Sequence, residues 1–333
     1  TQGRNQRILD LSKREVQDYI IDSLSAIFDS ADIRYCKWDM NRIFSDYYSQ
    51  GVAAERQGEL MHRYQIGLYR FMKVLTEKYP KILFEGCASG GNRYDLGILA
   101  YFPQIWTSDD TDAIMRSGIQ TNVSYGYPLA SFTCHVSDVP NHQTLRSTPL
   151  ETRYNIASFG CLGYEFNLCN MSEEDLQAVR EQVAQYKRLR KLFQYGDFYR
   201  VRNDQRVVQW TVVSEDKEEA VGLFFQKLTI PNNPTDCYKA RGLDANKLYR
   251  FTNQFEEEQA PQEENAAIVL QDNFEAFTKG KQKDEREDCV AYGSGLMNAG
   301  VMLRQAFAGT GFNSEMRMFR DFSSRLYHMK AVQ

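Results

Sequence analysis

The sequence predicts an α/β protein made of the C-terminal part of a (β/α)8 TIM barrel followed by a small antiparallel β-sandwich. In residues 1–195, short apolar runs alternate with long segments of helical periodicity, as in the βα units of a parallel sheet. In residues 196–333, short β-rich runs are separated by turns and acidic stretches, which is typical of antiparallel sheets. No GxGxxG or P-loop glycine pattern occurs, which weakens the nucleotide-binding alternative.

Five strands are expected in the barrel segment: "IRYCKWD", "KILFEGCAS", "FPQIWTSDD", "ASFTCHVSD" and "LGYEFNLC". Each ends in polar residues, as do barrel strands that present side chains at their C-terminal ends. A closed barrel needs eight strands. The visible ones correspond to about strands 4 to 8. Because the chain also begins without Met, we expect it to be the N-terminally truncated piece of a longer protein.

Helices are predicted between these strands. Residues 12–31 form one, with Ser12 and Glu15 as a capping box. A second covers about 52–79, and its apolar stripe consists of Leu60, Tyr64, Leu68, Phe71, Met72 and Leu75.

Two further helices have cap signals in the sequence. Ser172 with Asp175 caps the last helix of the barrel segment. The helix that starts "TDAIMRS" could be capped by Asp110 or Asp112.

The sandwich is expected to contain the runs "VRNDQRVVQWTVVS", "EEAVGLFFQKLTI", "NKLYRFT" and "NAAIVLQD", with a final strand in "MFRDFSSRLYHMK". Trp210 is expected in its core. The acidic stretch at 255–264 is interpreted as a solvated loop.

Composition excludes some classes of partner. The formal net charge is −4 without any Lys/Arg-rich run, so nucleic acid and anionic membranes are poor candidates. Seven cysteines lack CxxC and zinc-type spacing, and no apolar run has membrane-spanning length. We therefore expect a reducing, cytoplasmic location.

Two acidic positions point to chemistry. Asp39 ends a strand behind Lys37 and Trp38, and Asp109 heads the cluster "SDDTDA". The plainer interpretations are that Asp39 is a helix cap or a surface partner of Arg42, and that the cluster caps a helix. A separation of 70 residues corresponds to about two βα units, which places both acids on alternate strands of one barrel.

Two carboxylates facing one barrel mouth, with aromatic rings nearby, suit glycoside hydrolysis. A Mg²⁺ or Ca²⁺ site is the competing explanation of the acid cluster, although its spacing does not fit an EF-hand.

Long motifs carry a family resemblance. "KWDMNR", "CASGGNRYDLG", "PQIWTSDDTDAIMRSGIQ" and "HVSDVPNHQTLRSTPLETRYNIASFGCLGYE" resemble the bacterial α-galactosidases of glycoside hydrolase family 36. The resemblance continues through "GLDANKLYRF", "GSGLMNAGV" and "DFSSRLY" and so covers nearly the whole chain. It implies a retaining enzyme that releases terminal α-linked galactose from melibiose or raffinose without a cofactor or metal. The full-length protein would be a homo-oligomer, often a tetramer.

The resemblance also implies residue roles. Asp39 would be the nucleophile and Asp109 the acid/base. The residues that would contact galactose are Lys37, Cys87, Ser89, Gly90, Gly91 and Trp106. The supporting residues would be Trp38, Asn41, Arg42, Arg93, Asp95 and Asp110.

One position departs from the family pattern. Asn92 stands where members commonly carry glycine; because Asn tolerates left-handed backbone, the loop shape would survive. His135 and His142 are expected to be structural.

Two rival functions stay open. The first is galactosyl transfer to a sugar acceptor, as in related plant enzymes. The second is a non-catalytic sugar-binding remnant, against which the presence of both Asp39 and Asp109 argues. The isolated 333 residues are expected to be inactive, because the resemblance assigns further galactose contacts to earlier barrel strands and an N-terminal β-domain.

Overall fold

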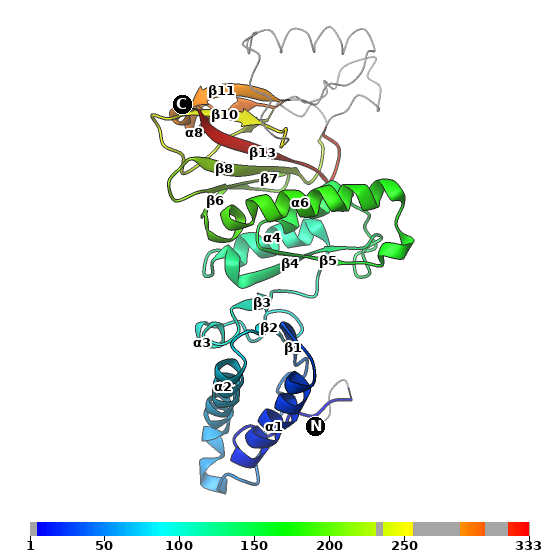
Figure 1. Cartoon of the computed structure of the whole chain (residues 1–333), viewed down its shortest axis with the longest axis vertical. Helices are drawn as coiled ribbons and strands as arrows, with labels where there is room; N and C mark the ends of the chain where they lie inside the picture. The colour runs from blue at the N-terminus through cyan, green and yellow to red at the C-terminus, as the bar shows by residue number, and fades with distance from the viewer. Residues whose placement is uncertain (1–4, 231–235, 256–286, 304–318, 333) are drawn as a thin grey trace. The chain divides into compact units, whose positions relative to one another are not determined.

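The computed structural model describes residues 5–230, 236–255, 287–303 and 319–332 (Figure 1). The chain divides into two compact units, one of residues 1–109 with 130–133 and one of residues 110–129 with 134–333. No helix in the described part of the chain is both long enough and apolar enough to cross a membrane.

The first unit contains three strands with helices between them. Its elements are α1 (Arg14–Ser30), β1 (Tyr35–Asp39), the 3-10 helix η1 (Ala54–Glu59), α2 (Leu60–Lys78), β2 (Leu83–Cys87), α3 (Leu96–Leu99), β3 (Gln104–Trp106) and the 3-10 helix η2 (Leu129–Ser131). β1 pairs with β2 and β2 with β3, both in parallel, and β3 pairs in parallel with the start of β4 (Phe132–Ser137). The sheet order is β1-β2-β3-β4-β5, with β5 at Cys161–Glu165. The predicted parallel sheet is confirmed.

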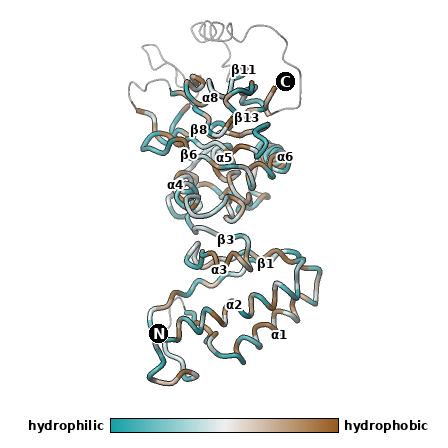
Figure 2. The backbone as a smooth tube through the Cα atoms, turned by 90° about the vertical axis from the view of Figure 1, so that its left-hand side faces the viewer, coloured by the Kyte–Doolittle hydropathy of each residue, from teal (hydrophilic) through white to brown (hydrophobic). Residues whose placement is uncertain are grey.

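Helices α1 and α2 lie side by side (Figures 1 and 2) and share one apolar core with the sheet. Apolar residues recur along both helices in Figure 2. The whole predicted stripe of α2 is buried. The start of α2 differs from the prediction, because residues 54–59 form a 3-10 turn before it.

The predicted capping box of α1 is wrong. The helix begins at Arg14 with Lys13 at the N-cap, which makes no side-chain cap hydrogen bond. Ser12 instead donates from its backbone amide and its hydroxyl to Asp10 Oδ1, at 3.1 and 2.5 Å. This local turn competes with capping for the serine hydroxyl.

Successive side chains of a strand point to opposite faces of the sheet, and the two faces of β1–β3 differ. Phe84 and Ile105 belong to the core shared with the helices, and Cys36 and Trp38 pack against it. The opposite face, which we call the site face, carries the alternate residues Tyr35, Lys37, Asp39, Leu83, Glu85, Cys87, Gln104 and Trp106.

The second unit carries the remaining helices and the antiparallel sheet. Its helices are α4 (Ala113–Val123), α5 (Leu150–Ala157), the 3-10 helix η3 (Leu168–Asn170), α6 (Glu173–Tyr195) and α8 (Gly293–Asn298). Ser172 caps α6 as predicted, since its Oγ accepts from Asp175 N at 3.1 Å. Asp112, one of the two candidates, caps α4.

A six-stranded antiparallel sheet follows α6, in the order β11-β10-β13-β8-β7-β6. Its strands are β6 (Asp197–Asn203), β7 (Val207–Val213), β8 (Glu219–Gln226), β10 (Leu248–Thr252), β11 (Asp288–Tyr292) and β13 (Ser323–Val332). A two-stranded sheet of β9 (Cys237–Tyr238) and β12 (Val301–Met302) accompanies it. The β-rich run "VRNDQRVVQWTVVS" contributes to two strands, β6 and β7, joined by a turn in which Asp204 Oδ1 accepts from Arg206 N and Val207 N. The expected strand "NAAIVLQD" and most of the acidic loop at 255–264 lie outside the described residues.

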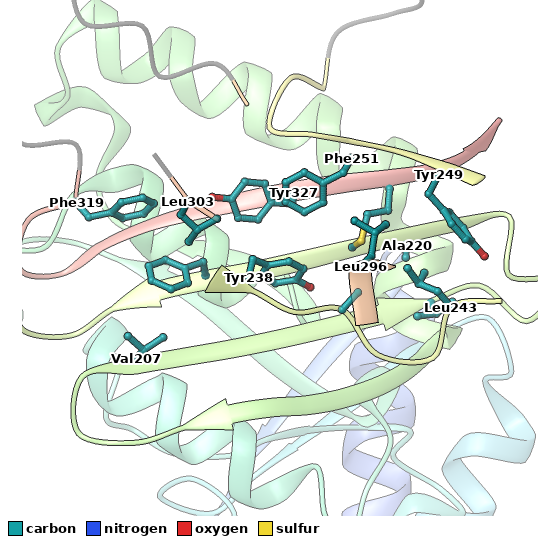
Figure 3. Packing of buried hydrophobic residues seen from close by; sticks show 14 residues of the cluster. Val207, Ala220, Tyr238, Leu243, Tyr249, Phe251, Leu296, Leu303, Phe319 and Tyr327 are labelled. Atoms are coloured by element: carbon teal, nitrogen blue, oxygen red, sulfur yellow. The ribbon is translucent and has the colours of Figure 1, made fainter. Parts of the chain in front are cut away.

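The six-stranded sheet is covered on both faces. On one face, Tyr238 of the small sheet packs among Phe251 and Tyr327, with ring centroids 5.7 and 5.2 Å from its own (Figure 3). On the other face, Trp210 is fully buried, stands 5.2 Å from the ring of Phe159 and donates to Thr121 Oγ1 at 3.2 Å. The prediction of Trp210 as a core residue is confirmed. The proposed domain boundary at 195/196 falls between α6 and β6 and stays a prediction.

Candidate active site

Asp39 ends β1 on the site face and is exposed. Cys87 of β2 lies opposite it in the parallel register. The ladder continues one step further, because Met40 N donates to Cys87 O at 3.0 Å. Asn41 then donates from Nδ2 to Asp39 Oδ2 at 2.6 Å, which fixes the orientation of this carboxylate.

Asn41 also holds the loop that follows β2. Its Oδ1 accepts from the backbone amide of Ser89 at 2.8 Å and from Ser89 Oγ at 3.1 Å. Ser89 and Gly90 both have positive φ, +52° and +84°. A Cβ on Gly90 would lie 2.7 Å from the Cα of Ser108, so this loop packs directly on the chain that follows β3.

Gly91 adds a second link to that chain, since its amide donates to the Thr107 carbonyl at 3.0 Å. The expectation for Asn92 is corrected here: its φ is not positive, and the left-handed residues of the loop are Ser89 and Gly90. Asn92 supports the loop differently, by donating from Nδ2 to Ala88 O at 2.6 Å.

Asp109 lies just beyond β3 and is exposed. Trp106, which is 3% exposed, donates from its indole Nε1 to Asp109 Oδ1 at 2.9 Å. The Lys37 ammonium stands 4.7 Å from the Trp106 ring centroid and 3.7 Å from Glu85 Oε1. The first unit thus contains a continuous set of contacts from Asp39 through the loop after β2 to the segment that bears Asp109.

Cys87 is buried beside Asp39, its register partner on β1. Burial raises the pKa of the Cys87 thiol to about 11, and a hydrogen bond to the Asp39 carboxylate adds to the shift. Arg93 donates to the Cys87 carbonyl. Burial lowers the pKa of the Arg93 guanidinium, because removing this cation from water disfavours its charged form.

Other sequence-selected residues have partners elsewhere. Trp38 points to the helix core, 5.3 Å from the ring of Phe71. Arg42 donates to Ser45 Oγ of its own loop at 2.9 Å. Asp95 caps α3 and accepts from Tyr69 OH at 3.1 Å.

The acids after Asp109 have structural partners in the second unit. Asp110 Oδ1 accepts from Asp112 N at 3.1 Å. Asp112 is buried, caps α4, and pairs with Arg146 at 2.7 Å and Thr144 at 2.6 Å. In the described part of the chain, no group of three or more His, Cys, Asp or Glu side chains is arranged to hold a metal ion.

The two histidines differ. His135 Nδ1 lies 2.9 Å from Glu165 Oε2, between β4 and β5, whereas His142 is exposed. Sequence reasoning missed Glu85 and Tyr35, both on the site face. Strand alternation from Asp39 and Cys87 was the signal that could have found them.

Two family models match the chain. Residues 1–196 match the family described as Melibiase, and residues 207–329 match the glycosyl hydrolase family 36 C-terminal domain. The chain belongs to glycoside hydrolase family 36.

Curated α-galactosidases are similar over three quarters of the chain. The α-galactosidase AgaA of Geobacillus stearothermophilus is 44% identical over 253 residues, which cover 75% of this chain and 35% of AgaA. The α-galactosidase 1 of Pediococcus pentosaceus is 48% identical over 250 residues, which cover 74% of this chain and 34% of that protein. The chain therefore spans about a third of the length of these relatives.

Solved structures of the family share the fold. The α-galactosidase of Lactobacillus brevis matches with a TM-score of 0.84 at 38% identity, over 100% of this chain and 40% of that one. AgaA matches with a TM-score of 0.83 at 38% identity, again over 100% and 40%. A variant of AgaA has been solved with raffinose bound. These similarities confirm the fold class expected from the sequence, a partial parallel barrel followed by an antiparallel domain.

Proposed function

We propose that the protein is a retaining α-galactosidase that releases terminal α-linked galactose from oligosaccharides such as melibiose and raffinose. Because the chain matches only about a third of its curated relatives, we also propose that these 333 residues form part of a longer enzyme. The observation that carries the proposal is the arrangement of Asp39 and Asp109. They follow alternate strands, β1 and β3, at the ends where barrel active sites lie. Relatives that carry the name α-galactosidase, with raffinose or stachyose bound in variants of AgaA, support the choice of substrate class.

The chemistry is a double displacement. The Asp39 carboxylate attacks the anomeric carbon, the bond from that carbon to the glycosidic oxygen breaks, and Asp109 gives its proton to the leaving oxygen. In the second step, Asp109 takes a proton from water, whose oxygen attacks the same carbon and releases Asp39. This assignment requires carboxyl groups about 5–5.5 Å apart in the complete enzyme, against about 6.5–9.5 Å for inversion.

The contacts of both acids suit these roles. The hydrogen bond from Asn41 Nδ2 orients the Asp39 carboxylate. The indole of Trp106 does the same for Asp109. The galactose would then contact Lys37 and Cys87, together with the loop residues Ser89, Gly90 and Gly91 and the ring of Trp106.

Substitution of each acid in the full-length protein tests the assignment. Asp39→Asn should abolish turnover of an aryl α-galactoside while galactose binding persists. Asp109→Asn should slow substrates with poor leaving groups far more than activated aryl galactosides, because only the former need the proton. NMR of the first-formed galactose should show the α-anomer; a β-anomer would refute the double displacement.

The chain alone is expected to be inactive, and expressing residues 1–333 beside the full-length protein tests this with the same substrate. Turnover at equal rates would show that the missing part is dispensable. Galactose transfer to a sugar acceptor instead of water would appear as larger oligosaccharides in digests of raffinose. A homotetrameric assembly and a cytoplasmic location stay predictions.

A further inference from the structure

Glu85 is a buried carboxylate in the middle of β2. It lies on the site face, opposite Lys37 of β1 and Gln104 of β3. Asp39 and Cys87 occupy the next row of this face toward the strand ends. Glu85 therefore sits directly beneath the row that carries the proposed nucleophile, and its side chain is 0% exposed.

Burying a carboxylate is costly unless cations or hydrogen-bond donors compensate. Tyr35 OH donates to Glu85 Oε2. Oε1 is buried and accepts no hydrogen bond, and the Lys37 ammonium stands 3.7 Å from it. Among the described residues, the only charged partner of Glu85 Oε1 is therefore the Lys37 ammonium.

The same ammonium also contacts Trp106, with Nζ 4.7 Å from the ring centroid. Lys37 is consequently held on one side by a carboxylate and on another by an aromatic face. A lysine has a long, flexible stem, so a fixed partner beneath it restricts where its remaining N–H groups point.

We propose that Glu85 is a positioning residue of the galactose site, which acts by orienting the Lys37 ammonium toward the sugar. The proposal rests on the proposed function, because it is Lys37 that would contact galactose. Glu85 itself touches no reacting atom. The Glu85 carboxylate forms an ion pair with Lys37 and is itself stabilised by the hydrogen bond from Tyr35.

The alternative is that Glu85 only stabilises the fold. The chain offers a matched control in Glu287, another buried carboxylate that accepts from a tyrosine, Tyr327, at 2.7 Å and pairs with a cation, Arg325, at 2.7 Å. Glu287 lies in the second unit and belongs to no part of the proposed site. Glu287→Gln is the same chemical change at a position with the same kinds of partner.

The experiment uses the full-length protein and compares Glu85→Gln with Glu287→Gln. Glu85→Gln keeps an acceptor for Tyr35 but removes the charge that faces Lys37. We expect kcat/KM for melibiose to fall about tenfold, mainly through a higher KM, and the inhibition constant of galactose to rise by a similar factor. Glu287→Gln should lower the unfolding temperature without changing KM. An unchanged KM and inhibition constant in folded Glu85→Gln would overturn the proposal.

A double-mutant cycle with Lys37→Met tests whether Glu85 acts through Lys37. In the Lys37→Met background, Glu85→Gln should change kcat/KM by less than about twofold. A full tenfold loss in that background would refute the proposal. If Glu85→Gln does not fold, Glu85→Asp can be used instead, because it retains the negative charge but moves it away from Lys37. An unchanged KM in Glu85→Asp would equally overturn the proposal.

Failure of the function itself is recognised separately. If the wild-type full-length protein turns over no α-galactoside, the proposed function is wrong and the role of Glu85 falls with it. If the wild type is active and only the Glu85 results disagree, the function stands and the positioning role is wrong.

Discussion

Asn41 joins the proposed nucleophile to the loop after β2, so its removal should affect both. Asn41→Ala would delete the 2.6 Å bond to Asp39 Oδ2 and the acceptor of the Ser89 amide at 2.8 Å. Bonds to charged groups contribute about 1.5–3 kcal/mol and neutral ones about 1 kcal/mol. Because Asp39 is exposed, we take the lower end for its bond. The free energy of unfolding should then fall by about 2.5 kcal/mol.

The same substitution leaves the Asp39 carboxylate free to rotate. A loss of about 1.4 kcal/mol in the transition state is tenfold in rate, so kcat for an aryl α-galactoside should fall about tenfold or more. Asn92→Ala is the matched control, since Asn92 holds the same loop through Ala88 O without contacting Asp39. Urea denaturation and steady-state kinetics of the full-length variants measure both quantities. If kcat of folded Asn41→Ala stayed within twofold of the wild type, Asn41 would not orient the nucleophile.

Further predictions concern the loop and the cysteines. Gly90→Ala places a Cβ 2.7 Å from Ser108 Cα at a residue with φ +84°, and should lower the free energy of unfolding by about 2 kcal/mol or more. The control Gly118→Ala, in helix α4 with nothing within 4 Å of the added Cβ, should leave stability unchanged or raise it. Denaturation curves that show equal stability for the two variants would contradict this. Iodoacetamide at pH 8 should label the exposed Cys169 and spare the buried Cys87. Labelling of Cys87 should rise only as the pH approaches about 11, the pKa of its thiol. Peptide mapping that finds both cysteines labelled at pH 8 would be inconsistent with a buried Cys87 thiol. Because the pKa of Cys87 is raised in the folded state, its contribution to stability is complete below the thiol's usual pKa of about 8.5 and is lost as pH rises toward about 11.

Local patterns predicted the parts of the fold that local physics determines. The apolar stripe of α2 is buried throughout, because a 3.6-residue period places these side chains on one face wherever the helix packs. Ser172 caps α6 for an equally local reason. The polar strand ends containing Asp39 and Asp109 likewise fall where a parallel sheet places them.

Details that depend on competing partners were not predictable. Ser12 had the right spacing for a cap, but Asp10 takes its amide and hydroxyl. Asn92 had the right residue type for left-handed backbone, but that conformation falls on Ser89 and Gly90, where the loop meets the chain after β3. The hydrogen-bond partner of Ser12 and the backbone conformation of the loop both depend on neighbouring residues that the periodicity of the sequence does not indicate.

Glu85 was missed for a related reason. In the sequence it is a single acid inside an apolar strand. Its pairing with Lys37 is apparent only from the strand register, which places the two residues opposite each other. Motifs in the sequence therefore identify the polar residues at the strand ends, whereas residues one row below them are identified only from the register of the strands.

The proposed covalent intermediate on Asp39 can be trapped directly. The full-length enzyme should be inactivated by a 2-deoxy-2-fluoro-galactosyl or cyclitol reagent of α-galactoside configuration, with peptide mass spectrometry locating the added sugar. A single label is expected on the peptide that contains Asp39. It should be absent from Asp39→Asn and should still form slowly in Asp109→Asn. A label on any other carboxylate, with Asp39 unmodified in inactivated enzyme, would contradict it.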